Sequence, residues 1–193
     1  MKSRIAHGRG FTLVELLVVV AIIGLLISLM IPALGKAKVR ARKVACGGTL
    51  HGLSVAMKVY LSENRERYPV AAQMPSVNTS LPALPAVLQN GGNSISATAW
   101  RCPADNVNYV RSSDNKAFGS YFEGETLSYE YNMSLGGKPV EQNFLYPNLG
   151  VAGIFVLTDF DAFHGNKGDT RAVNILFVDG HVGNIDDIAT ALH

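Results

Sequence analysis

The longest charge-free apolar stretch of the chain, residues 16–34, restricts the fold more than any other feature of the sequence. A helix rises about 1.5 Å per residue, so this stretch is long enough to cross a hydrocarbon core of about 30 Å. One carboxylate, Glu15, stands at its start. A charge at the edge of such a span is costly in lipid and usually has a function. We therefore predict a transmembrane helix over residues 11–35 with a functional acid near its beginning.

Residues 1–10 form a short basic segment that contains three cations, no acid and a glycine at its end. Cleavage after Gly10 would give Phe11 a free α-amine, about one helical turn from the Glu15 carboxylate. In an apolar medium opposite charges are weakly screened, so the amine of one subunit would attract the carboxylate of the next. We therefore expect residues 1–10 to be a cleaved leader and Glu15 to act in assembly.

Three simpler interpretations compete with this one. A secretory signal peptide has an apolar core of about 7–15 residues and a small-residue cleavage site, whereas this run is longer and begins at a charge. A plain signal anchor has the right length but does not account for the order of residues 10–15. A buried core helix is shorter and is seldom apolar on all sides.

The order Gly-Phe-Thr-Leu-Val-Glu at residues 10–15, with Pro32 inside the apolar run, resembles the prepilin signal of type IV pilins and type II secretion pseudopilins. The resemblance implies that a prepilin peptidase cuts after Gly10 and methylates Phe11, and that Glu15 guides assembly. It also implies a single-pass inner-membrane protein with a cytoplasmic leader and a periplasmic head, which then enters a periplasmic or cell-surface filament. The implied partners are further copies of the chain, other pseudopilins and a secretion platform with an assembly ATPase.

Apolar residues recur every three to four positions beyond the membrane span, which predicts an amphipathic continuation of the helix over residues 36–67. We expect the whole helix to run from Thr12 to about Arg67. Pro32 lacks an amide hydrogen and should kink it. The helix should stop before Pro69, because proline disfavours the helical conformation in the residue that precedes it.

Residues 68–193 are predicted to form one globular α+β head. Strand patterns occupy residues 127–131, 153–158, 173–178 and 181–185. Residues 73–92 look like a loop with at most a short helix near 83–89, and residues 106–119 look like another loop. Asp179-Gly180 predicts a two-residue type I′ hairpin. The expected fold is pilin-like, with a long N-terminal transmembrane and amphipathic helix packed on a small antiparallel sheet.

Two features of the head indicate chemistry. Cys46 and Cys102 would face an oxidising compartment after export and are a candidate disulfide, the alternative being two separate buried thiols. Asp159, Asp161 and Asp169 are a candidate calcium site, by resemblance to major pseudopilins that bind calcium in a C-terminal loop. The alternative is a set of turn-forming polar residues, because their spacing matches no EF-hand. We expect no other cofactor.

Charge and motif content exclude other classes of function. Without the three leader cations the chain has 14 basic and 15 acidic residues, so we expect no nucleic-acid partner. A nucleophile elbow, a phosphate loop and a Cys-x-x-Cys pair are all missing from the sequence, which argues against an enzyme. We predict a structural subunit of a type II secretion pseudopilus. The alternative is a type IV pilin for adhesion, motility or DNA uptake, because the leader is common to both.

Overall fold

The computed structural model describes residues 11–90 and 95–191. The predicted leader, with Gly10, lies outside the described residues. The chain divides into two compact units, one ending at Lys38 and one beginning at Val39. Helix α1 (Leu13–Glu63) is the longest element and contributes its first part to one unit and its second part to the other.

The first part of α1 exposes its apolar side chains. Its large apolar side chains, from Leu13 to Leu34, are all at least 44% exposed. Of the helices that the structure describes, α1 alone is long and apolar enough to cross a membrane. Pro32 lies inside α1, which continues beyond it. The predicted kink at Pro32 stays a prediction.

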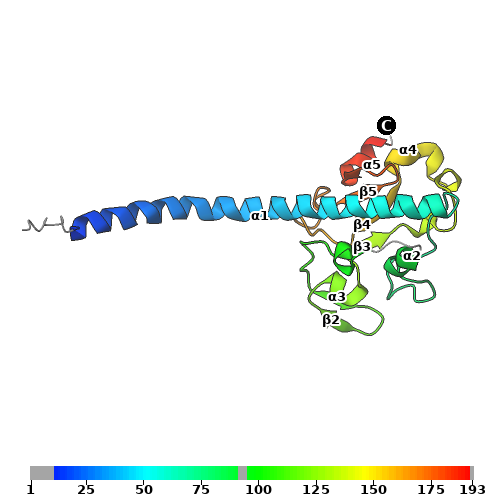
Figure 1. Cartoon of the computed structure of the whole chain (residues 1–193), viewed down its shortest axis with the longest axis horizontal. Coiled ribbons are helices and arrows are strands. Elements are labelled where there is room, and N and C mark those ends of the chain that lie inside the picture. Colours follow the sequence, from blue (N-terminus) through cyan, green and yellow to red (C-terminus); the bar gives the residue numbers. More distant parts are fainter. Residues whose placement is uncertain (1–10, 91–94, 192–193) are drawn as a thin grey trace, which may run out of the picture. The chain divides into compact units, whose positions relative to one another are not determined.

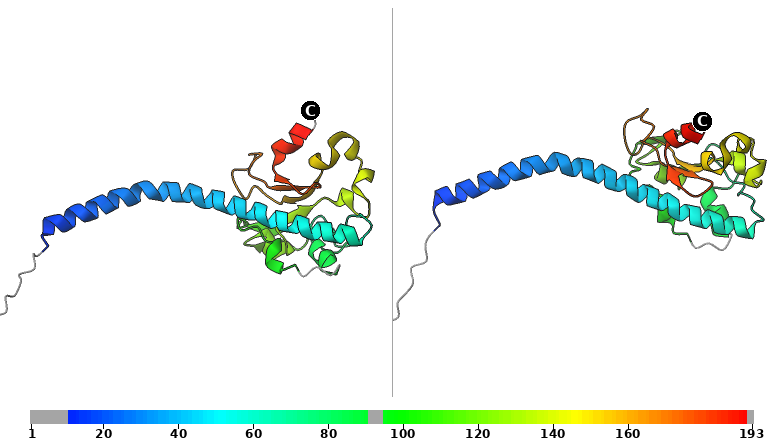
Figure 2. Two further views of the ribbon diagram at one scale, coloured as in Figure 1. Left: turned by 45° about the horizontal axis from the view of Figure 1, so that its top comes forward. Right: turned by 90° about the horizontal axis from the view of Figure 1, so that it is seen from above.

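The second part of α1 packs on a four-stranded antiparallel sheet, and this arrangement confirms the predicted α+β fold. Cys46, Leu50, Leu53 and Met57 are buried at three- to four-residue spacing, so one face of the helix enters the head core. Figures 1 and 2 show this part of α1 lying along the head. In spatial order the strands are β3 (Tyr129–Tyr131), β4 (Phe155–Asp159), β5 (Ile175–Phe177) and β6 (Val182–Gly183).

The core between helix and sheet is rich in aromatic side chains. Trp100, Tyr129 and Tyr131 are each at most 1% exposed. Tyr129 pairs with Asp159 across the β3–β4 ladder, and the β4–β5 register shifts between Phe155 and Leu157. This pairing places the carboxyl end of β4 beside the start of β3, under the second part of α1.

The β5–β6 hairpin forms as predicted, but its turn is different. Gly180 has φ 96° and Asp179 is not in the left-handed region, so the loop is not the type I′ turn that we expected. The Gly180 N–H donates to the Phe177 carbonyl, and the Phe177 N–H donates to the His181 carbonyl, each at 3.0 Å. These bonds close a three-residue loop, which needs positive φ only at its glycine.

Helix α1 ends at Glu63, four residues before the predicted end at Arg67. Arg65 and Glu66 both have φ 56°, a left-handed conformation that an α-helix cannot continue through. The Glu66 N–H donates to the Leu61 carbonyl at 2.9 Å, and this bond closes the helix end.

Several short elements were not predicted from the sequence. Strands β1 (Tyr109–Arg111) and β2 (Lys116–Phe118) form a hairpin in the segment that we expected to be a loop. Helix α2 (Leu84–Asn90) is an exception, because a short helix was predicted near residues 83–89. The remaining helices are η1 (Ala97–Trp100), α3 (Tyr121–Glu125), η2 (Met133–Leu135), η3 (Val140–Gln142), α4 (Tyr146–Gly153) and α5 (Ile185–Ala191).

Candidate functional site

The first turn of α1 is closed by a pair of reciprocal hydrogen bonds between Thr12 and Glu15. The Glu15 N–H donates to Thr12 Oγ1 at 3.3 Å, and the Thr12 N–H donates to Glu15 Oε2 at 2.9 Å. Thr12 Oγ1 also donates to Oε2, at 2.7 Å. The helix begins at Leu13, so these residues occupy the N-cap and N3 positions of a capping box. Both residues follow Gly10, so cleavage there would leave the capping box intact.

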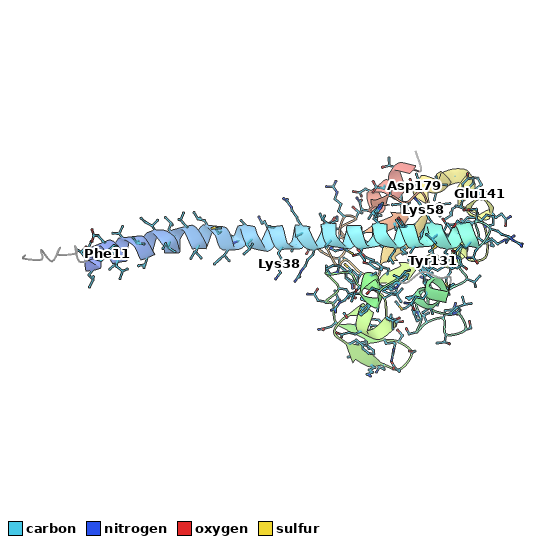
Figure 3. All side chains as sticks on the ribbon, viewed as in Figure 1. Phe11, Lys38, Lys58, Tyr131, Glu141 and Asp179 are labelled. Atoms are coloured by element: carbon cyan, nitrogen blue, oxygen red, sulfur yellow. The ribbon has the colours of Figure 1, made fainter. Side chains whose placement is uncertain are left out.

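The surroundings of this capping box are apolar and open. Phe11 is 73% exposed at the start of the segment (Figure 3). Glu15 is the only ionisable side chain between Phe11 and Leu34. The arrangement therefore presents one carboxylate at the end of an exposed hydrophobic helix, a setting in which an ionic partner from another molecule would be strongly favoured.

A second group of chemically active residues lies inside the head. One ligand atom from each of four buried side chains falls within 4.8 Å of the other three, and these residues are Cys46, Cys102, Asp159 and His164. Cys46 comes from α1, Cys102 follows η1, and Asp159 ends β4. His164 lies in the loop after β4, where its N–H donates to the Ala172 carbonyl at 3.0 Å.

Three contacts between members of this cluster are 3.3–3.5 Å long. His164 Nε2 lies 3.3 Å from Asp159 Oδ2 and 3.5 Å from Cys102 Sγ. Cys46 Sγ lies 3.5 Å from Asp159 Oδ1 and 3.5 Å from the Tyr129 hydroxyl. The other ring nitrogen, Nδ1 of His164, is buried without a hydrogen-bond partner among the described residues, so Nε2 is the nitrogen that faces the cluster.

Burial and mutual contact shift the proton affinities of these groups. The neighbouring Cys102 thiol lowers the pKa of Cys46 to about 5, against the opposing effect of burial. Burial raises the pKa of Asp159 to about 7. Burial would lower the pKa of His164, but its contacts with Asp159 and Cys46 raise that pKa to about 9. The cluster can therefore hold both anionic and cationic groups at neutral pH, although burial keeps all four side chains away from a substrate in solvent.

Comparison with known proteins identifies the N-terminal segment. Residues 6–31 match the family model of the prokaryotic N-terminal methylation motif. The type IV major pilin protein PilA of Myxococcus xanthus is 43% identical over 62 residues, which are 32% of this chain and 28% of the pilin. The type II secretion system core protein G of Escherichia coli is 37% identical over 82 residues, which are 42% of this chain and 56% of that protein.

The N-terminal part of this chain is similar to those of type IV pilins and type II secretion pseudopilins. The matched segments span only about a quarter and about half of the two curated relatives, at 28% and 56% of their lengths. No solved structure matches the chain. For this pilin-like protein, the similarity therefore rests on the N-terminal motif and on the two partial matches.

The predicted site residues differ in whether the structure brings them together. Phe11 precedes the N-cap residue Thr12, and Glu15 lies in the first turn of α1. Cys46 and Cys102 are brought together in the head, but both are free thiols. The candidate disulfide is therefore not formed in this structure.

The three aspartates of the predicted calcium site have different surroundings. Asp159 joins the two cysteines in the buried cluster. Asp161 lies 3.7 Å from the Lys167 ammonium, and Asp169 accepts a hydrogen bond from the Arg171 N–H at 2.9 Å. Neither belongs to the four-residue cluster. Calcium binding stays a prediction. The sequence pattern did not identify His164 as a member of the cluster, because the four residues follow no ligand spacing that a motif records.

Proposed function

We propose that this chain is a structural subunit of a type II secretion pseudopilus. It is made as a precursor, cut after Gly10 and methylated on Phe11 by a prepilin peptidase, and held in the inner membrane by residues 11–35. The head then lies in the periplasm, and the subunit is drawn into a filament that drives protein export. The observation that carries this proposal is the exposed, charge-free stretch of α1 over residues 16–34, which directly follows Glu15 in the methylation motif.

The geometry at Glu15 supports a role in assembly. Both hydrogen bonds from Thr12 end on Oε2, whereas Oε1 accepts none from the residues that the structure describes. One carboxylate can therefore cap its own helix and accept the Phe11 amine of a neighbouring subunit at the same time. In a bundle of apolar helices this ion pair is weakly screened, so assembly would neutralise two charges that the membrane leaves unpaired.

The outer face of α1 in the head unit supports contact with further copies. Val44 and Val55 are 76% and 54% exposed. Gly48 and Gly52 lie on the same exposed face, and a Cβ added at either would meet no atom within 4 Å. Each glycine costs about 1 kcal/mol in a helix relative to alanine. Because the single chain offers no packing reason for them, we infer that they allow close approach of another helix in the filament.

A type IV pilin is the second candidate, and the 43% identity to the Myxococcus pilin favours it. The match to the secretion protein covers more of both chains, so the pseudopilus remains the first choice. In either system the subunit would need an assembly ATPase and a membrane platform, because its sequence contains no phosphate-binding loop. The other partners would be related pseudopilins or pilins.

The direct test is to co-express the precursor with a prepilin peptidase and to determine the mature N-terminus by mass spectrometry. We expect a chain that begins with methylated Phe11, and an uncut precursor when the peptidase carries an inactivating mutation. A precursor that stays intact with the active peptidase would overturn the proposal. Deleting the subunit in its own host then separates the two systems, because a pseudopilin mutant loses secreted enzymes and a pilin mutant loses surface fibres.

A further inference from the structure

We propose that Cys46, Cys102, Asp159 and His164 bind one Zn²⁺ ion in a closed tetrahedral site that fastens α1 to the sheet of the head. The proposal does not depend on the function of the filament. It rests on the identity of the four side chains, on their distances and on their complete removal from solvent.

The identity of the ligands favours zinc. Two thiols, one imidazole and one carboxylate combine the soft and intermediate ligands that zinc takes in proteins, whereas calcium and magnesium prefer oxygen alone. Four protein ligands fill a tetrahedral shell and leave no position for substrate, which is the arrangement of structural rather than catalytic zinc sites.

The distances fit the edges of a zinc tetrahedron. With zinc–sulfur bonds of about 2.3 Å and zinc–nitrogen or zinc–oxygen bonds of about 2.1 Å, neighbouring ligand atoms stand about 3.4 Å apart for nitrogen and oxygen, and about 3.6 Å apart when one is sulfur. The known distances are 3.3 Å from His164 Nε2 to Asp159 Oδ2, 3.5 Å from Nε2 to Cys102 Sγ, and 3.5 Å from Cys46 Sγ to the other carboxylate oxygen, Asp159 Oδ1. One ligand atom from each of the four side chains lies within 4.8 Å of the others, so a bound ion would draw the longer pairs together.

A cluster without metal explains the same distances less well. A charge-assisted bond between imidazolium and carboxylate is about 2.7–2.9 Å long, which is shorter than the 3.3 Å between His164 and Asp159. Both side chains are 0% exposed. A buried ion pair with poor geometry does not recover the free energy of desolvation, so a binding role explains this pair better than a purely ionic one.

Groups around the cluster would orient two of the ligands. The Asn174 N–H donates to Asp159 Oδ2 at 2.7 Å and fixes the carboxylate. The Tyr129 hydroxyl lies 3.5 Å from Cys46 Sγ and can donate to a thiolate there. Such outer contacts typically hold metal ligands in place. The ion would be bound by two thiolates, one carboxylate and one neutral imidazole, which leaves a net charge of −1 on the site, and any protons that the free cluster carries on these four groups would be released on binding.

The positions of the ligands give the site a mechanical role. Cys46 is the only ligand on α1, and the other three come from the loop after η1, the end of β4 and the loop that follows it. Zinc would therefore join the helix to segments that lie more than fifty residues further along the chain. In a filament subunit this bond would transmit force between the helical core and the head.

The test uses the full-length chain, purified in detergent from membranes, with metal content measured by mass spectrometry. We expect about one zinc per chain, and two cysteines that resist thiol reagents until a chelator removes the metal. Replacement of zinc by Co²⁺ should give the thiolate charge-transfer band and the strong visible bands of a tetrahedral thiolate site. These readouts need no variant, so they remain valid if a ligand substitution prevents folding.

Variants then locate the ion. C102S and H164Q should reduce the zinc content to background, whereas H181Q, which removes a histidine outside the cluster, should leave it unchanged. Y129F keeps all four ligands, and we expect zinc to be lost to a competing chelator at about a tenfold lower chelator concentration. A Cys46–Cys102 disulfide without zinc, two reactive thiols without zinc, another metal in the site, or full zinc content in C102S and H164Q would each overturn the proposal.

Discussion

The two parts of helix α1 have the same backbone structure but opposite relations to the rest of the chain. Up to Lys38 the large apolar side chains are exposed on all sides. From Val39 onward one face is buried, and Cys46, Leu50, Leu53 and Met57 enter the core of the head. Burial of apolar surface is the main favourable term in folding, so the second part is stabilised by its own head. The first part needs lipid or other subunits.

The comparison also explains where charge is placed. In the first part Glu15 is the single acid in a long apolar stretch. Its capping box with Thr12 supplies hydrogen bonds at the start of the helix from neighbouring residues of the same segment. In the second part charged residues such as Lys58 lie on the solvent side, where Lys58 Nζ donates to the Asp179 carbonyl at 3.3 Å (Figure 3). The helix therefore changes from an exposed apolar element to an element of the head core.

The largest expected effect on head stability comes from the buried face of α1. L53A should lower the free energy of unfolding of the head by about 2–5 kcal/mol, because it leaves a cavity between helix and sheet. V55A, on the exposed face of the same turn, should change it by no more than about 0.5 kcal/mol. Trp100 is the only tryptophan and is 1% exposed, so its fluorescence during denaturant unfolding of the full chain reports on the head. Equal effects of the two variants would contradict the assignment of the faces.

A charge in the first part of α1 should act on membrane insertion and not on the head. I23R should disfavour insertion by about 3 kcal/mol, because arginine at the centre of a span is costly. The measurement is the fraction of the chain that resists carbonate extraction from membranes. I23L is the matched control and should insert normally. The unfolding midpoint reported by Trp100 should be the same in both, and a shift with I23R would show that this residue contributes to the head.

Alanine substitutions at glycines on two faces of α1 distinguish effects on folding from effects on assembly. G48A and G52A should each stabilise the head by up to about 1 kcal/mol, since alanine is the better helix former and its Cβ meets open space. Both should also reduce the filament yield, because the added methyl keeps neighbouring helices apart. G47A is the matched control: its Cβ would meet only Val182 of the same chain, at 3.8 Å, so we expect the stability gain without the loss of filaments. Normal filament yield with G48A and G52A would remove this face from the assembly contact.

The sequence predicted the elements whose pattern is local. The charge-free stretch and the three- to four-residue spacing predicted α1, and β-branched and aromatic runs predicted β3 to β6. The end of α1 was placed too late because Arg65 and Glu66 adopt positive φ, a conformation that long side chains rarely take and that no local signal announces. Strands β1 and β2 were missed because each has three residues and their turn depends on Asn115 at φ 55°.

The two candidate sites also differ in how far their residues could be predicted from the sequence. The site at Phe11 and Glu15 lies within five consecutive residues, so its members could be recognised from their order along the chain. The buried cluster brings together Cys46, Cys102, Asp159 and His164 from four separate segments. Their proximity depends on the register of β3 with β4 and on the packing of α1, which a single sequence does not reveal. This is why the sequence did not group Asp159 with Cys46 and Cys102.

Filament yield with two substitutions at Glu15 tests most directly whether the first part of α1 is completed by other copies of the chain. E15Q can keep the capping box but removes the charge, whereas E15L removes both. The filament yield would be measured as the fraction of the subunit that a crosslinker joins into multimers in intact cells, with each precursor processed to the same extent. We predict that both variants lose most of their filaments, because the Phe11 amine of the neighbouring subunit then has no anion to bind. Fibres at the wild-type level with E15L would contradict the account.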